Sequence, residues 1–88
     1  MHYVYLLQSV KDNRTYVGYT SNLNKRLREH KAGRVRATKH RMPLKLLFFE
    51  EFELSQEAKK REKWWKNGAG RRKLRSMYKN YELNQNDS

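Results

Sequence analysis

The stretch from His2 to Thr20, HYVYLLQSVKDNRTYVGYT, decides the fold of this chain. Residues 2–8 are rich in aromatic and branched apolar side chains, a composition typical of a largely buried strand. Residues 11–14, KDNR, have the polar composition of a turn, and residues 15–20, TYVGYT, favour a second strand. The stretch therefore predicts an antiparallel hairpin.

The position of the loop determines which residues of this hairpin face one another. A loop made of residues 11–14 pairs Ser9 with Tyr16. Because side chains alternate along a strand, Tyr5 and Tyr16 then project from the same face of the sheet. A loop one residue longer or shorter would break this shared orientation.

The rest of the chain predicts helices around one further strand. We expect first a helix that is capped by Thr20 or Ser21, runs to about Lys31 and stops at Gly33, then a basic loop at 34–42 and a strand at 44–49. We then expect a helix at about 56–67 capped by Ser55, a break at Gly68–Gly70, and a helix from about Arg71 with Leu74, Met77, Tyr78 and Tyr81 on its apolar face. The order β-β-α-β-α-α predicts one α/β (α+β) domain over residues 1–83, a mostly antiparallel sheet covered by helices, followed by a polar tail at 84–88.

The charge balance indicates the class of partner. The 88 residues include 21 Lys+Arg and 9 Asp+Glu, a formal net charge of +12, and the sequence pI is about 10.2. Such a domain favours a polyanion, because Lys and Arg contacts to phosphates release counterions. Charge alone does not separate DNA from RNA, or either of them from an acidic membrane surface.

The composition also excludes several classes of protein. The chain has no cysteine, which excludes a disulfide scaffold, a thiolate zinc site and a cysteine nucleophile. No apolar run approaches the roughly 20 residues that span a bilayer, and MHYVYLLQS has no basic region ahead of its apolar run, as a secretory signal would. We therefore expect a small soluble protein of the cytoplasm that does not associate with membranes.

A few polar residues stand out because packing does not require them. At about 100° per residue, Leu23 and Leu27 define the buried stripe of the first helix, and Arg26 and His30 lie together beside it. In the helix at 56–67, Glu62 shares a face with apolar residues, which is uncommon for an acid. Arg26 is thus the basic residue expected to be held against the protein.

Each of these residues also has a purely structural interpretation. The tyrosines could be ordinary half-buried strand residues, Arg26 could lie over the sheet with its charge in water, and His30 could interact with the last carbonyls of its helix. Glu62 could form an ion pair with Arg61 or Lys66. Of the two tryptophans, Trp64 and Trp65, we expect one to be partly exposed.

The same residue types are sufficient for hydrolysis of a phosphodiester. A carboxylate can hold a hard divalent cation whose shell is completed by waters. An arginine can bind the phosphate oxygens with two parallel hydrogen bonds. A tyrosine or histidine can transfer a proton if a neighbouring cation lowers its pKa.

Taken together, the motifs resemble the GIY-YIG nuclease family. The matching residues are Tyr3-Val4-Tyr5, then Tyr16-Val17-Gly18, then Leu23-x-x-Arg26-x-x-x-His30-x-x-Gly33. Glu62, in Lys60-Arg61-Glu62-Lys63, lies where that family has its metal-binding glutamate. The resemblance covers residues 2 to about 78 and is closest to the small single-domain bacterial branch. The sequence departs from the pattern at Tyr3, which replaces a glycine, and at Val4 and Val17, which replace isoleucines.

This resemblance implies a three-stranded antiparallel sheet flanked by helices and the cleavage of nucleic-acid phosphodiesters with one divalent cation, magnesium (Mg²⁺) or manganese (Mn²⁺). By position, Tyr5 would act as general base, Tyr16 would position the water or the phosphate, and Arg26 would stabilise the transition state. His30 would transfer a proton or contact the phosphate, and Glu62 would hold the metal. Gly18 would let the backbone come close to the site. Larger members often place an asparagine late in the domain, for which Asn67 and Asn80 are candidates that no motif distinguishes.

We therefore expect a metal-dependent endonuclease, acting on structured or branched DNA in repair or recombination. The alternative is a nucleic-acid-binding module, for DNA or RNA, with little or no turnover; a purely structural basic protein would leave Glu62 unexplained. With no separate DNA-recognition domain expected in so short a chain, selectivity would come from its own surface or from a protein partner. The residues expected to contact nucleic acid are Lys25, Arg34, Arg36, Lys39, Arg41, Arg71, Arg72 and Lys73.

Overall fold

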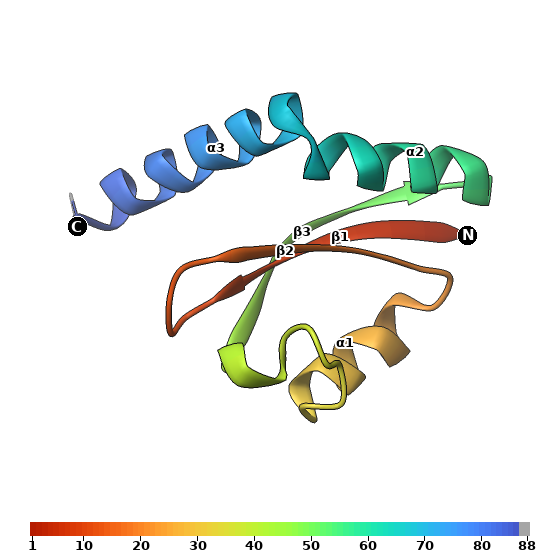
Figure 1. The fold of residues 1–88 in the computed structure, drawn as a ribbon, viewed down its shortest axis with the longest axis horizontal. Coiled ribbons are helices and arrows are strands. Elements are labelled where there is room, and N and C mark those ends of the chain that lie inside the picture. The colour runs from red at the N-terminus through yellow and green to blue at the C-terminus, as the bar shows by residue number, and fades with distance from the viewer. Residues whose placement is uncertain (87–88) are drawn as a thin grey trace.

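The computed structural model describes the backbone of residues 1–86 and the side chains of residues 1–77. Its elements are β1 (His2–Ser9), β2 (Thr15–Thr20), α1 (Leu23–Lys31), the 3₁₀ turn η1 (Lys39–Arg41), β3 (Leu44–Phe52), α2 (Ser55–Lys66) and α3 (Gly68–Asn86). The strands form one antiparallel sheet in the order β2-β1-β3. Helix α1 covers one face of the sheet, and α2 and α3 lie along the other (Figure 1). The predicted α+β class and element order are confirmed.

The predicted hairpin is confirmed, but its register is wrong. Tyr16 pairs with Leu7 instead of Ser9. The pairing has moved by two residues along the strand, and side chains alternate with a period of two. Tyr5 and Tyr16 consequently still project from the same face, as predicted.

The side chain of Ser9 explains where the loop forms. The Ser9 backbone N–H donates to the Arg14 carbonyl (2.9 Å), so the loop consists of residues 10–13 instead of 11–14. The Ser9 hydroxyl oxygen accepts from the backbone N–H of Lys11 (3.1 Å) and of Asp12 (3.3 Å). Asn13 closes the loop with φ +63°, a left-handed conformation that asparagine tolerates.

The first helix begins later than predicted and stops where predicted. Its cap is Asn22, whose side chain accepts from the Lys25 N–H (3.2 Å), and neither Thr20 nor Ser21. The Thr20 hydroxyl instead accepts from the Asn22 N–H (3.1 Å) and so supports the cap. Gly33 has φ +72°, the left-handed conformation that ends a helix.

Two further boundaries differ from prediction. Ser55 is the first residue of α2 and no side chain caps that helix; its N-cap is Leu54, whose carbonyl accepts from the Ala58 N–H (3.3 Å). Strand β3 continues to Phe52, beyond the predicted 44–49.

The predicted break between the last two helices is present, but it lies at Asn67 instead of Gly68–Gly70, and α3 begins at Gly68. A Cβ on Gly70 would overlap the Trp64 carbonyl and the Trp65 backbone. Gly70 is therefore a close-contact residue that lets α3 approach α2.

The last helix continues to Asn86. Of its predicted apolar face, Leu74 is buried and Met77 is exposed. The side chains of Tyr78 and Tyr81, and residues 87–88 of the predicted polar tail, lie outside the described residues. None of the helices in the described part of the chain is both long and apolar enough to span a membrane.

The main core lies between the sheet and the α2–α3 layer. It joins Val4, Leu6 and Val17 of the strands to Ala58, Trp65 and Leu74 of the helices. Trp65 is buried and Trp64 is half-buried, which confirms that one tryptophan is partly exposed. The opposite face of the sheet is left for the polar side chains described below.

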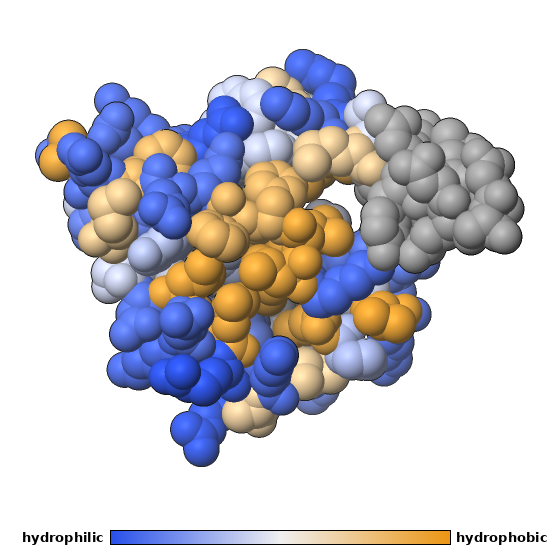
Figure 2. Space-filling view, turned by 180° about the vertical axis from the view of Figure 1, so that it is seen from behind, coloured by the Kyte–Doolittle hydropathy of each residue, from blue (hydrophilic) through white to orange (hydrophobic). Residues whose placement is uncertain are grey.

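One side of the molecule carries a patch of apolar side chains surrounded by hydrophilic ones (Figure 2). The exposed apolar residues of the structure include Leu46 and Phe49 of β3, an edge strand of the sheet. A cavity of about 260 Å³ is lined by Leu46 and Phe48 of β3 and by Leu74 and Met77 of α3. Strand β3 and helix α3 therefore expose apolar side chains at this edge of the sheet.

Candidate active site

Tyr5 lies across its neighbouring strand because that strand has a glycine opposite it. Tyr5 pairs with Gly18, and a Cβ on Gly18 would overlap the ring and hydroxyl of Tyr5. The ring therefore occupies the space that a side chain would fill, and Tyr5 is 0% exposed. Gly18 makes room for the tyrosine itself, and in this way it shapes the site.

The Tyr5 hydroxyl begins a buried chain of hydrogen bonds. It lies 2.9 Å from Nε2 of His30, and Nδ1 of His30 lies 2.7 Å from the Thr38 hydroxyl. All three residues are at most 1% exposed. His30 is thus held between two hydroxyl groups, and it is not a residue that satisfies only the end of its helix.

Thr38 is a site residue that the sequence did not reveal. It lies in the predicted basic loop 34–42, where charged residues dominate the composition. The loop is anchored by buried Val35, whose carbonyl accepts from the Thr38 N–H (3.1 Å), and by the Ser9 hydroxyl, which donates to the Arg41 carbonyl (2.6 Å). A threonine eight residues after a histidine is a weak signal, since only this anchoring brings the two together.

The two titratable side chains in this series of hydrogen bonds, Tyr5 and His30, are both neutral at neutral pH. Burial, and secondarily the positive charge of Arg26, lowers the pKa of His30 to about 4. Burial raises the pKa of Tyr5 to about 12, and nearby Arg26 offsets only part of this effect. A neutral imidazole donates at one nitrogen and accepts at the other, so His30 can donate to one of the two hydroxyl groups and accept from the other.

Arg26 lies on the solvent side of the hydrogen bonds that join Tyr5, His30 and Thr38. Its side chain is 37% exposed and its Nη1 lies 3.3 Å from Oε1 of Glu29 in the same helix. The hydroxyl of Tyr5 raises the pKa of Arg26, with Glu29 contributing less. Arg26 is therefore held near Tyr5 while part of its guanidinium remains available to a ligand.

Tyr16 completes a group of three rings. Its ring centroid lies 6.2 Å from that of Tyr5 and 5.3 Å from that of His30. Unlike those two residues, Tyr16 is only half-buried. The structure thus brings Tyr5, Tyr16, Arg26 and His30 together, with Tyr16 and Arg26 on the side that a substrate can reach.

The structure places Glu62 on α2, across the sheet from α1 (Figure 1). Its carboxylate lies 3.3 Å from Nζ of Lys66, and its side chain is 23% exposed. Among the described residues, no hydrogen bond or ion pair joins Glu62 to the ring group. Lys59 lies on the same side of the helix, with Nζ 5.6 Å from the centre of the Tyr19 ring in β2. Glu62 is therefore on the side of α2 that faces the edge strand β2.

The other acid near α2 has a structural role. Glu50 of β3 accepts from Nε of Arg61 (3.0 Å) and from Nε1 of Trp65 (2.8 Å). Burial raises the pKa of Glu50, but these two hydrogen bonds and the charges of Arg61 and Lys73 together outweigh it and hold the pKa below its usual value. Arg61 is thus committed to Glu50, and the ion pair of Glu62 is the one with Lys66.

Among the described residues, a divalent cation would find one carboxylate ligand, that of Glu62, and no larger set of ligands. Among them, no group of three or more His, Asp and Glu side chains could hold a metal ion. Mg²⁺ commonly binds one or two carboxylates and completes its shell with waters and substrate phosphates. Glu62, whose one ion-pair partner among the described residues is an exposed lysine, fits that mode of binding.

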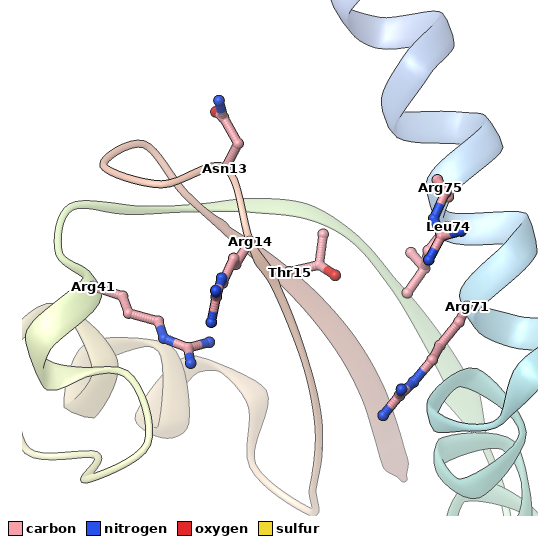
Figure 3. A pocket seen from close by; sticks show the side chains of 7 residues that line it. All are labelled: Asn13, Arg14, Thr15, Arg41, Arg71, Leu74 and Arg75. Atoms are coloured by element: carbon pink, nitrogen blue, oxygen red, sulfur yellow. The ribbon is translucent and has the colours of Figure 1, made fainter.

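The residues predicted to contact nucleic acid are at the surface, and two of them line one groove. Arg41 is half-buried, and the exposed members are Lys25, Arg34, Arg36, Lys39, Arg71, Arg72 and Lys73. Of these, only Arg41 and Arg71 line a common groove, together with Arg14 and Arg75 (Figure 3). The sequence did not single out Arg14 and Arg75, because they lie outside the two basic clusters.

Comparison with known proteins supports the motif assignment. The chain is 43% identical to a UPF0213 protein of Clostridium perfringens over 75 residues, which cover 84% of this chain and 80% of that one. It is 40% identical to a UPF0213 protein of Staphylococcus haemolyticus over 77 residues, covering 86% and 93% of the two chains. The solution NMR structure of a UPF0213 protein from Bacillus halodurans has a TM-score of 0.54 at 32% identity and covers 86% of this chain and 81% of its own. Residues 1–75 match the model of the GIY-YIG catalytic domain, and the chain belongs to the GIY-YIG family.

Proposed function

We propose that this protein is a metal-dependent endonuclease of the cytoplasm that hydrolyses phosphodiester bonds in structured or branched DNA during repair or recombination. The observation that carries the proposal is the buried chain from Tyr5 through His30 to Thr38, bordered by a half-exposed arginine and tyrosine. Groups whose pKa values are shifted in opposite directions at one site are typical of proton transfer. The family membership supports nuclease chemistry at that site.

The exposed members of the site would bind the substrate. The guanidinium of Arg26 can form two parallel hydrogen bonds with the phosphate oxygens and neutralise charge in the transition state. The hydroxyl of Tyr16 can hydrogen-bond the attacking water or the phosphate. A divalent cation held by Glu62 would add positive charge at the phosphate and lower the pKa of the attacking water.

The buried members would handle the proton. Because the pKa of Tyr5 is about 12 and that of His30 about 4, the proton stays on Tyr5 in the free protein. Tyr5 therefore acts as a base only if it releases its own proton toward Nε2 of His30 as it accepts one from the water. Thr38 holds His30 in the orientation that this transfer requires.

The second candidate function is a nucleic-acid-binding module with little or no turnover. The position of Glu62 across the sheet, paired with Lys66, favours this alternative. So does the complete burial of Tyr5, which keeps its hydroxyl away from solvent. A nucleic-acid complex of this kind would bind with a strong dependence on salt and form no metal-dependent product.

Cleavage assays separate the two functions. The chain is incubated with branched, flapped and single-stranded DNA and with RNA, in magnesium, manganese or a chelator. We expect Arg26→Ala and Glu62→Ala to abolish cleavage while leaving binding largely intact. The matched controls are Arg28→Ala in α1 and Glu57→Ala in α2, both exposed residues of the same two helices. Undiminished cleavage by both active-site variants would refute the catalytic assignment, and the absence of product from the parent would favour the binding module.

A further inference from the structure

Four arginines line a groove to which the ring group itself does not contribute. The groove has a volume of about 650 Å³ and is lined by Arg14, Arg41, Arg71 and Arg75. Figure 3 shows Arg14 of the hairpin and Arg41 of η1 on one side, and Arg71 and Arg75 of α3 on the other. Among the described side chains, no acidic one lines the groove. Segments distant in sequence therefore bring four positive charges to one cavity.

Within the described part of the chain, no salt bridge neutralises these charges. None of its ion pairs involves the four arginines; they join Arg26 to Glu29, Arg61 to Glu50 and Lys66 to Glu62. Asp12, the acid whose pKa the charges of Arg41 and Arg14 help to lower, is bound mainly to the Arg14 backbone N–H (3.0 Å). Like charges one helical turn apart, as at Arg71 and Arg75, are mildly destabilising. A polyanionic ligand would relieve this repulsion.

The lining also indicates which part of a polyanion the groove takes. Guanidinium groups bind phosphate oxygens with planar, paired hydrogen bonds. Among the residues whose side chains the structure describes, none that lines the groove carries an aromatic ring on which a base could stack. Contacts to phosphate position a nucleic acid without reading its sequence.

The groove adjoins the candidate active site through one strand. Thr15 of β2 lines the groove, and the next residue, Tyr16, belongs to the ring group. Successive side chains of a strand point to opposite faces, and β2 is an edge strand of the sheet. Arg41 likewise lies three residues after Thr38, which binds His30. A nucleic-acid strand crossing the edge of β2 would therefore contact both the groove and Tyr16.

We propose that this arginine groove binds the phosphodiester backbone of a nucleic-acid strand next to the phosphate held at Tyr16 and Arg26, independently of sequence. The statement about the neighbouring phosphate rests on the proposed function. Binding by the groove itself does not.

The test measures binding in a chelator, so that cleavage does not interfere. The affinity for fluorescently labelled single-stranded DNA is determined by anisotropy between 50 and 200 mM salt for the parent, Arg14→Gln/Arg75→Gln and a control. The control is Lys60→Gln/Lys63→Gln, which removes the same charge from exposed positions of α2. With a slope of about 0.7 per phosphate on a single strand, we expect the groove variant to reduce the dependence of log K on log salt by about 1.4. The control should change it by much less.

Other outcomes would overturn the proposal. Equal changes in slope for the groove and control variants would mean that the groove makes no special contact. Complete displacement of the DNA by inorganic pyrophosphate at equal phosphate concentration would assign the groove to a free polyphosphate. The charge-retaining variant Arg14→Lys/Arg75→Lys should keep the parental slope, and its loss of slope would mean that misfolding explains the result.

The two proposals can fail separately. Suppose that the parent cleaves no substrate in magnesium, but that the groove variant shows the expected smaller dependence of log K on log salt. The endonuclease proposal then fails, and the proposal that the groove binds a phosphodiester backbone is supported. If the parent cleaves DNA or RNA and the groove variant has the same salt dependence of binding as the control, only the proposal about the groove fails.

Discussion

The burial of His30 should make the stability of the protein depend on pH. The pKa of His30 is about 4 in the folded chain, against about 6.5 when a histidine is exposed on unfolding. Below pH 6.5 the unfolded chain therefore binds a proton that the folded chain does not, and folding is disfavoured. The stability contributed by this group is fully present above pH 6.5 and is lost progressively as the pH falls toward 4.

The size of this effect follows from the shift. Integrating the linkage between pH 7 and pH 4.5 gives a loss of about 2 to 3 kcal/mol from His30 alone. Urea unfolding at the two pH values measures it. Carboxylates also titrate near the lower value, so the informative quantity is the difference between variants.

We expect His30→Gln to lose less stability than the parent over this pH range, by about 2 to 3 kcal/mol. His40→Gln, which changes an exposed histidine, should behave like the parent. The comparison uses the change in the free energy of unfolding with pH, so it remains valid even if His30→Gln is less stable at every pH. An equal loss of stability in His30→Gln and the parent would refute the inference that His30 is buried in its neutral form.

Three further substitutions test other contacts of the site. Gly18→Ala places a methyl group against the ring of Tyr5, and it should lower the free energy of unfolding by about 1 to 3 kcal/mol in urea; an unchanged midpoint would contradict the close contact. Thr38→Val leaves Nδ1 of buried His30 without its partner and should lower stability by about 1 to 3 kcal/mol, whereas Thr38→Ser should restore it and failure of that rescue would argue against the hydrogen bond. Arg26→Lys keeps the charge but loses the paired hydrogen bonds, so we expect kcat to fall at least about tenfold with binding retained; parental kcat would argue against a bidentate contact.

The parts of the fold that were predictable depend on local patterns. The aromatic and branched apolar composition of HYVYLLQ and TYVGYT is sufficient to place two strands, and Gly33 is sufficient to end the first helix. The register failed because a side chain, the hydroxyl of Ser9, determines where the loop closes. Gly70 was misinterpreted because its small size serves a contact with another helix, which the local sequence cannot show.

The residues of the candidate site that belong to a sequence motif were predictable. Those that only tertiary contacts bring to the site were not. Tyr5, Tyr16, Arg26 and His30 come together because two paired strands and one helix determine their relative positions. Thr38 was missed because the loop that carries it is held by contacts with Val35 and Ser9. The predicted role of Glu62 in metal binding stays a prediction, since its position depends on how α2 lies against the sheet.

Strand β2 contacts the ring group, the arginine groove and helix α2. This position explains why so short a segment carries so much of the family's motif. Tyr16 contributes to the ring group, and Gly18 admits the ring of Tyr5. On the other face, Thr15 lines the arginine groove and Tyr19 lies beneath Lys59 of α2, the helix that carries Glu62. Because side chains alternate across the sheet, one edge strand reaches both layers. Chemistry that combines residues from opposite faces would therefore have to take place across the edge of β2, and a substrate bound there would bring the arginine groove and Glu62 to the same phosphodiester chain as Arg26.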